Sequence, residues 1–163
     1  MAAAMTSPES TPTDIPARFG HVGSVRINFE DFDATGTVHD SRYLLLVERA
    51  VMDYWLDRGW HFDPPLSRFA DVLQVVRHFA ITYHTPITGM GVVGVHFWIE
   101  QVATSSLTYG FHVHSADRSI LHAEGSRTQI RLDPATHHAV PLSVELVAEA
   151  HRLRRPRDLV GGG

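Results

Sequence analysis

The spacing of hydrophobic and polar residues changes along this chain in an order that predicts strand, helix and then more strands. Alternating apolar positions from Val25 to Phe29 predict a half-buried strand. The stretch 30–37, rich in Asp and Gly, predicts a turn. Residues 41–58 contain no Gly or Pro and are followed by Gly59, which predicts a helix that ends there.

The predicted helix over residues 41–58 is apolar around most of its circumference. A helix of this kind is buried on several sides, so we expect other elements to surround it. Its polar residues fall near one narrow stripe, at spacings of seven, four and four: Arg42, Arg49, Asp53 and Asp57.

After Pro64 and Pro65 come four long runs in which apolar residues keep a period of two, as in β-strands. The breaks between the runs are short and turn-like, which predicts antiparallel neighbours. A short helix is expected over residues 143–153. The runs cover residues 72–84, 92–102, 107–115 and 120–132. The whole pattern predicts an α+β fold in which a curved five-stranded antiparallel sheet is wrapped around a long central helix.

The composition excludes several classes of function. The 163 residues carry a formal net charge of −4, so there is no basic surplus to collect nucleic-acid phosphates. The absence of cysteine excludes disulfides, thiolate metal ligands and a cysteine nucleophile. No stretch approaches the ~18 uninterrupted apolar residues of a membrane span, and no signal-peptide pattern is present. We expect a cytoplasmic protein with neither a nucleic-acid nor a membrane partner.

The composition predicts that the chain divides into a folded domain and two flexible ends. Residues 1–17 are rich in Ser, Thr, Pro and Ala and are expected to be disordered. Residues 18–155 are expected to form the single folded domain, and residues 156–163 a flexible tail.

The strand-to-helix junction reads Phe29-Glu30-Asp31-Phe32-Asp33-Ala34-Thr35-Gly36-Thr37-Val38-His39-Asp40-Ser41-Arg42-Tyr43. These residues resemble the corresponding segment of the hotdog-fold acyl thioesterases, in the branch of 4-hydroxybenzoyl-CoA thioesterase and the acyl-CoA thioesterases of the Tol-Pal operon. Supporting matches lie at residues 83–86 and 105–109, and the resemblance extends over residues 22–153. It implies a hotdog fold and a thioesterase.

Thioester hydrolysis needs a carboxylate that attacks the carbonyl carbon or activates water. It also needs a group that polarises the carbonyl, which the N–H groups and positive dipole end of a helix start can supply. Asp33 lies just before the predicted helix, and the backbone N–H groups around Asp40 and Ser41 form its first turn. Gly36 allows a sharp turn between them.

The resemblance assigns roles to these residues. It aligns Asp33 with the catalytic carboxylate of the family, Gly36 with its turn glycine, and the Asp40 backbone N–H with the group that polarises the carbonyl. The alternative for Asp33 is that it only shapes a turn. His39 and Asp40 depart from the residues usual at these positions. The resemblance also implies substrate contacts for Val38, His39, Tyr43 and Glu48.

Asp31 and Glu48 also have structural interpretations. Asp31 is expected to be structural. Glu48 matches a family glutamate, but a polar residue on a buried helix is more often a packing and hydrogen-bonding partner. By charge alone, Arg77, Arg127 and Arg131 are candidates to contact CoA phosphates, and the alternative is that each is a solvated surface residue.

The predicted function is hydrolysis of an acyl-CoA or acyl-carrier-protein thioester to free acid and thiol, without a cofactor. The resemblance implies a homodimer or homotetramer with the substrate channel between subunits. One alternative is a hotdog hydratase or dehydratase acting on an enoyl or 3-hydroxyacyl thioester, which would use His39 with a carboxylate. The other is a non-catalytic acyl-thioester binding protein. His112 and His114 share a strand face, but no third ligand at a suitable spacing accompanies them, so no metal site is expected.

Overall fold

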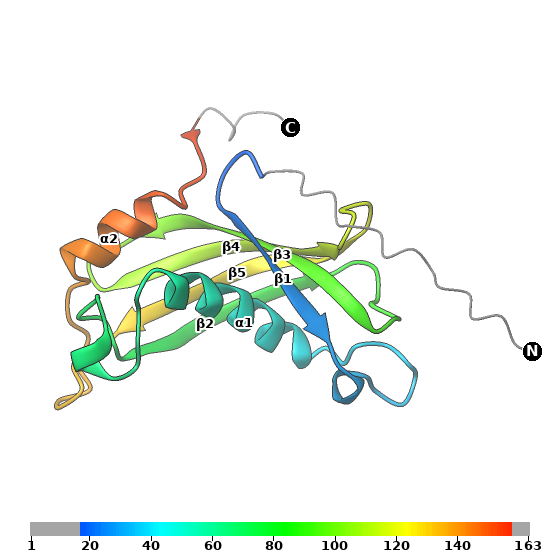
Figure 1. Ribbon diagram of the computed structural model, residues 1–163, viewed down its shortest axis with the longest axis horizontal. Coiled ribbons are helices and arrows are strands. Elements are labelled where there is room, and N and C mark those ends of the chain that lie inside the picture. The colour runs from blue at the N-terminus through cyan, green and yellow to red at the C-terminus, as the bar shows by residue number, and fades with distance from the viewer. Residues whose placement is uncertain (1–16, 158–163) are drawn as a thin grey trace, which may run out of the picture.

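The structure is a computed structural model that describes residues 17–157. The predicted disordered segment and flexible tail lie outside the described residues, apart from residues 17, 156 and 157. Within this part of the chain, five strands and two α-helices follow the predicted order (Figure 1). They are β1 (His21–Ile27), α1 (Arg42–Asp57), β2 (Gln74–Tyr83), β3 (Gly91–Val102), β4 (Ser106–Ser115), β5 (Leu121–Arg131) and α2 (Val144–His151). Two short 3₁₀ turns cover Phe29–Asp31 and Pro64–Leu66.

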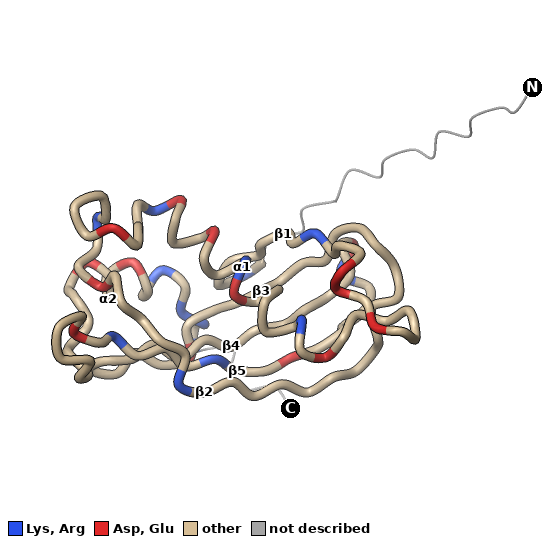
Figure 2. The backbone as a smooth tube through the Cα atoms, turned by 90° about the horizontal axis from the view of Figure 1, so that it is seen from below, with Lys and Arg blue, Asp and Glu red and all other residues tan. Residues whose placement is uncertain are grey.

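The five strands form one antiparallel sheet in the order β1-β3-β4-β5-β2. The strands at its two edges are therefore β1 and β2, as the view from below shows (Figure 2). The register shifts once in each of three strand pairs, for example between Val76 and His78 of β2. Such bulges bend the strands and increase their twist, and the sheet curves across one face of α1 (Figure 1). The predicted curved five-stranded antiparallel sheet with a central helix is confirmed.

The apolar face of α1 packs against this sheet. The helix comes closest to edge strand β1, where a Cβ added to Gly23 would lie 3.0 Å from the Cβ of Ala50. Two small residues therefore allow the close approach. The buried residues of α1 recur every three or four positions, as a single helix face requires: Tyr43, Leu46, Val47, Ala50, Val51, Tyr54 and Trp55.

Two details of the predicted pattern are wrong. The first strand ends at Ile27, and Phe29, expected to be its inward-facing residue, begins a 3₁₀ turn with 82% of its surface exposed. The helix is also less enclosed than expected, because Leu45 and Leu56 remain 36% and 45% exposed in the single chain. The sheet covers one face of the helix and leaves the side of the polar stripe open, where Arg49, Asp53 and Asp57 are exposed.

A buried carboxylate joins α1 to α2. Glu149 of α2 is 5% exposed, and its Oε1 accepts hydrogen bonds from the Arg58 guanidinium at 2.9 Å and from the Tyr54 hydroxyl at 3.3 Å. Charged partners make the burial of this carboxylate tolerable. No helix of the described chain is long and apolar enough to cross a membrane.

Candidate active site

A pocket of about 270 Å³ opens at the start of α1, where the segment that follows β1 meets the end of β2. The segment before α1 contributes two carboxylates and the turn into the helix, and the end of β2 contributes a phenol and a histidine. Since β2 is an edge strand, the pocket lies at the margin of the sheet. Its lining residues are Asp33, Thr37, Val38, His39, Asp40, Tyr43, Tyr83, His84, Thr85 and Pro86.

The structure brings most of the predicted site residues together here. Gly36 lies in the loop beside the pocket, whereas Glu48 lines a separate cavity further along α1. Tyr83 and His84 were missed by the sequence prediction, and their place in a supporting family match was their only signal. The predicted residues that line the pocket are Asp33, Val38, His39, Asp40 and Tyr43.

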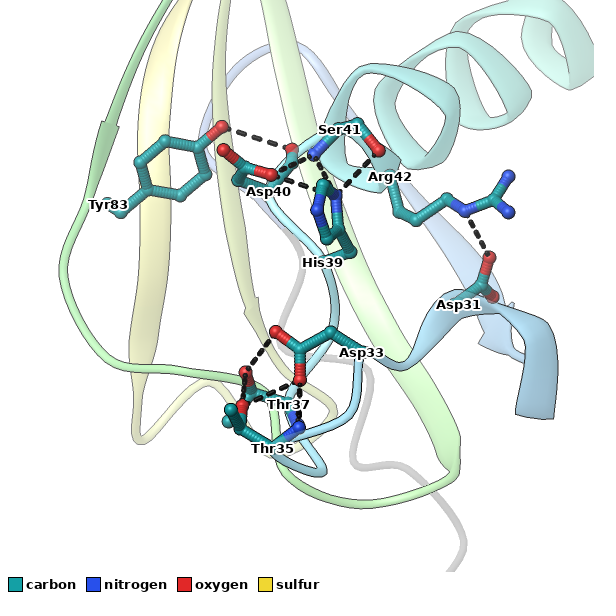
Figure 3. A network of polar contacts seen from close by, with 9 residues as sticks. All are labelled: Asp31, Asp33, Thr35, Thr37, His39, Asp40, Ser41, Arg42 and Tyr83. Atoms are coloured by element: carbon teal, nitrogen blue, oxygen red, sulfur yellow. Dashed lines mark hydrogen bonds and ion pairs between the residues drawn. The ribbon is translucent and has the colours of Figure 1, made fainter.

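The Asp33 carboxylate holds its own loop in shape (Figure 3). Its Oδ1 accepts hydrogen bonds from the Thr35 backbone N–H at 2.8 Å and from the Thr35 hydroxyl at 2.6 Å. Thr37 adds a backbone N–H at 3.3 Å from Oδ1 and a hydroxyl at 3.3 Å from Oδ2. These are the bonds of a turn-shaping aspartate. Because Oδ2 accepts only one of them, it keeps the capacity to meet a substrate or a water molecule.

The same hydrogen bonds lower the pKa of Asp33 below its ordinary value, and the Thr35 hydroxyl has the largest effect. The carboxyl group is therefore ionised at neutral pH. An ionised carboxylate can attack a carbonyl carbon directly or accept a proton from water.

Gly36 makes the turn that separates Asp33 from the helix. Its backbone N–H donates to the Asp33 carbonyl at 3.2 Å, and its φ of +79° lies in the left-handed region that favours glycine. A Cβ at this position would meet no atom within 4 Å. The requirement for glycine here is thus conformational and not steric.

The Asp40 backbone N–H is available to a ligand, since it donates no hydrogen bond to any other residue in the 17–157 range. The N–H groups that follow are occupied. That of Ser41 donates to the Asp40 carboxylate at 2.9 Å and to His39 Nδ1 at 3.1 Å, and that of Arg42 donates to the His39 carbonyl at 2.9 Å. A free N–H beside a helix start can polarise a carbonyl oxygen.

The end of β2 is tied to this helix start. The Tyr83 hydroxyl donates to the Asp40 carbonyl at 3.1 Å, and the Tyr43 and Tyr83 rings meet edge to face with centroids 5.1 Å apart. Burial raises the pKa of Tyr83, and the nearby Asp40 charge raises it further. The phenol therefore stays protonated and can donate. On the other side of Asp40, His39 Nδ1 lies 2.8 Å from its Oδ1 (Figure 3).

Asp31 has a structural position. It is 1% exposed, its Oδ2 accepts from the Asn28 backbone N–H at 2.8 Å, and its Oδ1 lies 4.0 Å from Arg42 Nε. Its carbonyl also accepts from the His39 backbone N–H at 2.9 Å. Asp31 thereby fixes the junction between β1 and α1, in agreement with the structural interpretation of this residue.

The interpretation as solvated surface residues is wrong for Arg127 and only partly right for Arg131. Arg127 is 3% exposed and faces α1 from β5. Arg131 is half-buried, lies 3.6 Å from the fully buried Asp71 carboxylate and donates to the Pro141 carbonyl at 2.7 Å. Arg77 is exposed on β2.

The histidines on the outer face of the sheet are neighbours, since His96 of β3 pairs in register with His112 of β4. Glu124 lies 3.5 Å from His112 and 3.2 Å from His84. Within residues 17–157, no three His, Cys, Asp or Glu side chains form a group that could hold a metal ion.

Comparison with known proteins identifies the family. The model of the thioesterase superfamily matches residues 35–121, more than half of the chain. The chain belongs to the thioesterase superfamily. The matched segment starts in the loop after Asp33 and includes the whole of α1 and three strands. The predicted membership of the hotdog thioesterases is confirmed, and with it the prediction of a thioester hydrolase.

Individual proteins are similar to this chain over a longer stretch than the family model covers. The chain is 26% identical over 125 residues to the acyl-CoA thioester hydrolase YbgC of Escherichia coli, covering 77% of this chain and 91% of that protein. It resembles the crystal structure of the PA5185 protein from Pseudomonas aeruginosa with a TM-score of 0.73 and 18% identity, covering 83% and 92% of the two chains. It also resembles Slr0204, a 1,4-dihydroxy-2-naphthoyl-CoA thioesterase from Synechocystis, with a TM-score of 0.69 and 17% identity, covering 83% and 98%. These structures share the hotdog fold.

Proposed function

We propose that the chain hydrolyses acyl-CoA thioesters in the pocket at the start of α1. The observation that carries the proposal is the pairing, in one pocket, of an ionised carboxylate, Asp33, with an unoccupied backbone N–H, that of Asp40. The name of the relative YbgC, an acyl-CoA thioester hydrolase, supports CoA as the thiol.

The geometry supports a two-step reaction. The Asp40 N–H donates to the thioester carbonyl oxygen and stabilises the negative charge that develops there. The Asp33 carboxylate attacks the carbonyl carbon, the C–S bond breaks, and the thiolate leaves and takes up a proton. Water then hydrolyses the resulting anhydride, which releases the acid and restores the carboxylate. In the alternative, Asp33 acts as the base that removes a proton from the attacking water.

We further propose that the working form is a homodimer joined along β2. This edge strand has no neighbour on one side within the described chain, and Val75, Val76 and Tyr83 on it are 39%, 41% and 46% exposed. An open apolar edge favours pairing with another strand. Because Tyr83 also lines the pocket, a partner at β2 would lie beside the active site. A Val75→Lys variant should shift the mass in light scattering from dimer to monomer.

A hydratase remains the second candidate, because His39 Nδ1 lies 2.8 Å from a carboxylate oxygen of Asp40 in the same pocket. Such a pair suits acid–base chemistry on an enoyl thioester. Hydration would remove the enoyl absorbance without releasing thiol.

Thiol release from a panel of acyl-CoAs tests the proposal. The panel runs from acetyl-CoA through octanoyl-CoA to palmitoyl-CoA and includes benzoyl-CoA, with the matching acyl-carrier-protein thioesters in parallel. The proposal expects turnover of at least one CoA thioester. Thiol release from the carrier-protein thioesters alone would contradict CoA as the thiol of the substrate and would favour the carrier protein. Absence of thiol release from both kinds of thioester would contradict thioester hydrolysis.

A further inference from the structure

A second cavity, of about 140 Å³, lies beside the C-terminal half of α1, between this helix and strands β2 and β5. Its walls are mostly apolar and aromatic, with Val51 and Trp55 from α1, Trp60 from the following loop and Val76 from β2. Four polar side chains interrupt this lining: Glu48, Gln74, Arg127 and Gln129. The Gln74 amide group donates to the Asp71 carbonyl at 3.1 Å. We call the other three residues, Glu48, Arg127 and Gln129, the polar niche.

Arg127 is the unusual member of the polar niche. It is 3% exposed, and its Nε and Nη1 are buried without a hydrogen-bond partner among the described residues. Its Nη2 lies 3.6 Å from a Glu48 carboxylate oxygen, which is beyond hydrogen-bond distance. Burial lowers the pKa of Arg127, but a guanidinium starts so high that it stays charged. Buried donors without partners are costly and rare in folded proteins.

Gln129 presents the complementary group. Its Oε1 is also buried without a hydrogen-bond partner in the described part of the chain. Residues two apart on a strand share a face, and the register places Arg127 opposite Tyr109 and Gln129 opposite Leu107 on the buried side of the sheet. The cavity therefore offers a ligand both buried donors, from Arg127, and a buried acceptor, from Gln129.

A hydroxyl group matches this set. It can accept a hydrogen bond from Arg127 and donate one to Gln129 Oε1. A carboxylate offers no donor to Gln129, and it would lie near the Glu48 carboxylate, which already balances the charge of Arg127. Charge and hydrogen-bond capacity thus favour a neutral hydroxyl.

The separation between the pocket and the polar niche limits the ligand that could join them. Glu48 follows Asp40 by eight residues, a rise of about 12 Å along a helix. On the sheet side, Phe79 pairs in register with Arg127 and lies four residues from Tyr83, about 13 Å along a strand. A single aromatic ring with a para-hydroxyl group is too short to span this distance, whereas an extended aliphatic chain of medium length can.

We propose that the acyl group of the substrate is an aliphatic chain with a hydroxyl group near its far end, which binds in the polar niche while the thioester lies at the start of α1. This inference rests on the proposed function for the position of the thioester. The apolar walls around Trp55 and Trp60 would hold the last methylene groups, and the Arg127 and Gln129 side chains would determine specificity.

Calorimetric binding of the free acids tests the polar niche without any need for turnover. Wild type should bind ω-hydroxydecanoate at least about tenfold more tightly than decanoate, the worth of one hydrogen bond to a charged group. Arg127→Met and Gln129→Leu should each abolish most of this preference. Arg26→Met, which removes an exposed arginine on the opposite edge strand β1, should keep it. Arg127→Met should stay folded, because it removes two buried donors without hydrogen-bond partners and leaves Glu48, which is 45% exposed, in contact with water. If Arg127→Met does not fold, Gln129→Leu alone tests the preference for the hydroxy acid.

Thiol release from ω-hydroxydecanoyl-CoA and decanoyl-CoA separates the two proposals. Selective binding of the hydroxy acid without any thiol release would overturn the proposed function and leave the niche in place. Thiol release at equal kcat/KM from the two thioesters, with equal binding of the two acids, would contradict hydroxyl binding in the polar niche. The proposed thioester hydrolysis would be unaffected by that result. Tighter binding of decanedioate than of ω-hydroxydecanoate would overturn the hydroxyl assignment in favour of an anion.

Discussion

The Tyr83 hydroxyl donates a 3.1 Å hydrogen bond to the carbonyl of Asp40, so the end of β2 is attached to a residue that lines the pocket and whose N–H has no partner in the described part of the chain. The bond joins two segments that are 43 residues apart in the chain. It holds the Asp40 peptide by its carbonyl oxygen, next to the N–H that we propose to polarise the thioester.

A Tyr83→Phe variant should therefore lower kcat for thiol release about two- to tenfold, as expected for the loss of one neutral hydrogen bond that positions a reacting group. KM should change less, because the ring remains. Thr82→Ala, at the neighbouring exposed position on β2, is the matched control and should keep wild-type kcat. Equal kcat in Tyr83→Phe and wild type would contradict the positioning role.

The conformation of Gly36 gives a prediction with an internal control. Gly36→Ala should lower the free energy of unfolding by about 1 kcal/mol, because its φ of +79° is strained for any residue with a Cβ. Gly89 also has free space for a Cβ but has no positive φ. Gly89→Ala should therefore leave stability unchanged or slightly raised. Denaturant unfolding of both variants checks this, and equal effects would show that φ is not the cause.

The buried Glu149 carboxylate should raise the free energy of unfolding through its hydrogen bonds. Its Oε1 accepts from both Arg58 and Tyr54, and Glu149→Gln weakens both bonds. We expect a loss of about 1–3 kcal/mol in the free energy of unfolding. Glu145→Gln, on the exposed side of the same helix, is the control and should cost less than about 1 kcal/mol. The reverse order of the two losses would contradict a structural role for Glu149.

The outer-face histidines predict a dependence of stability on pH. Burial lowers the pKa of His96 to about 4 and also lowers those of His112 and His114. Unfolded histidines titrate near 6.5, so between about pH 6.5 and 4 the unfolded chain binds more protons than the folded chain. The free energy of unfolding should therefore be highest above this window and fall as the pH is lowered through it.

His96→Gln keeps a donor for the Phe19 carbonyl, which His96 Nε2 contacts at 2.8 Å, and removes the titrating ring. Urea unfolding between pH 7 and about pH 4.5 should therefore show a shallower decline for this variant than for wild type. His151→Gln, at an exposed site on α2, should decline like wild type. A wild-type stability that stays constant across the window would contradict neutral buried histidines.

Much of the fold follows from the sequence, because the spacing of apolar residues along a segment reflects its secondary structure and the side that is buried. Alternation predicted all five strands, and the run ending at Gly59 predicted α1 to within a residue or two. Phe29 was misplaced because the alternation continues past Ile27, while the chain has already turned into the 3₁₀ helix Phe29–Asp31, where the Asp31 carboxylate accepts a hydrogen bond from the Asn28 backbone N–H. The exposure of Leu45 and Leu56 depends on what covers the helix, which periodicity does not reveal.

The site residues could be predicted only where they lie close together in the sequence. Asp33, His39 and Asp40 are close in sequence, and the junction motif brought them into one hypothesis. Tyr83 reaches the same pocket through strand pairing across the sheet, and no local pattern encodes such a contact. The burial of Arg127 was missed for the same reason, since charge alone predicts a surface position.

The most direct test of the central claim compares kcat for thiol release between Asp33→Asn and Asp117→Asn. Asp117 is a matched control, because its carboxylate also accepts hydrogen bonds from its own loop, from Ser115 and Ser119, but it lies outside the pocket. Asparagine keeps an acceptor oxygen at both sites, so both variants should fold. We predict that Asp33→Asn lowers kcat at least about 100-fold and that Asp117→Asn leaves it unchanged. A kcat of Asp33→Asn within a few-fold of wild type would contradict the assignment of Asp33 as the catalytic carboxylate.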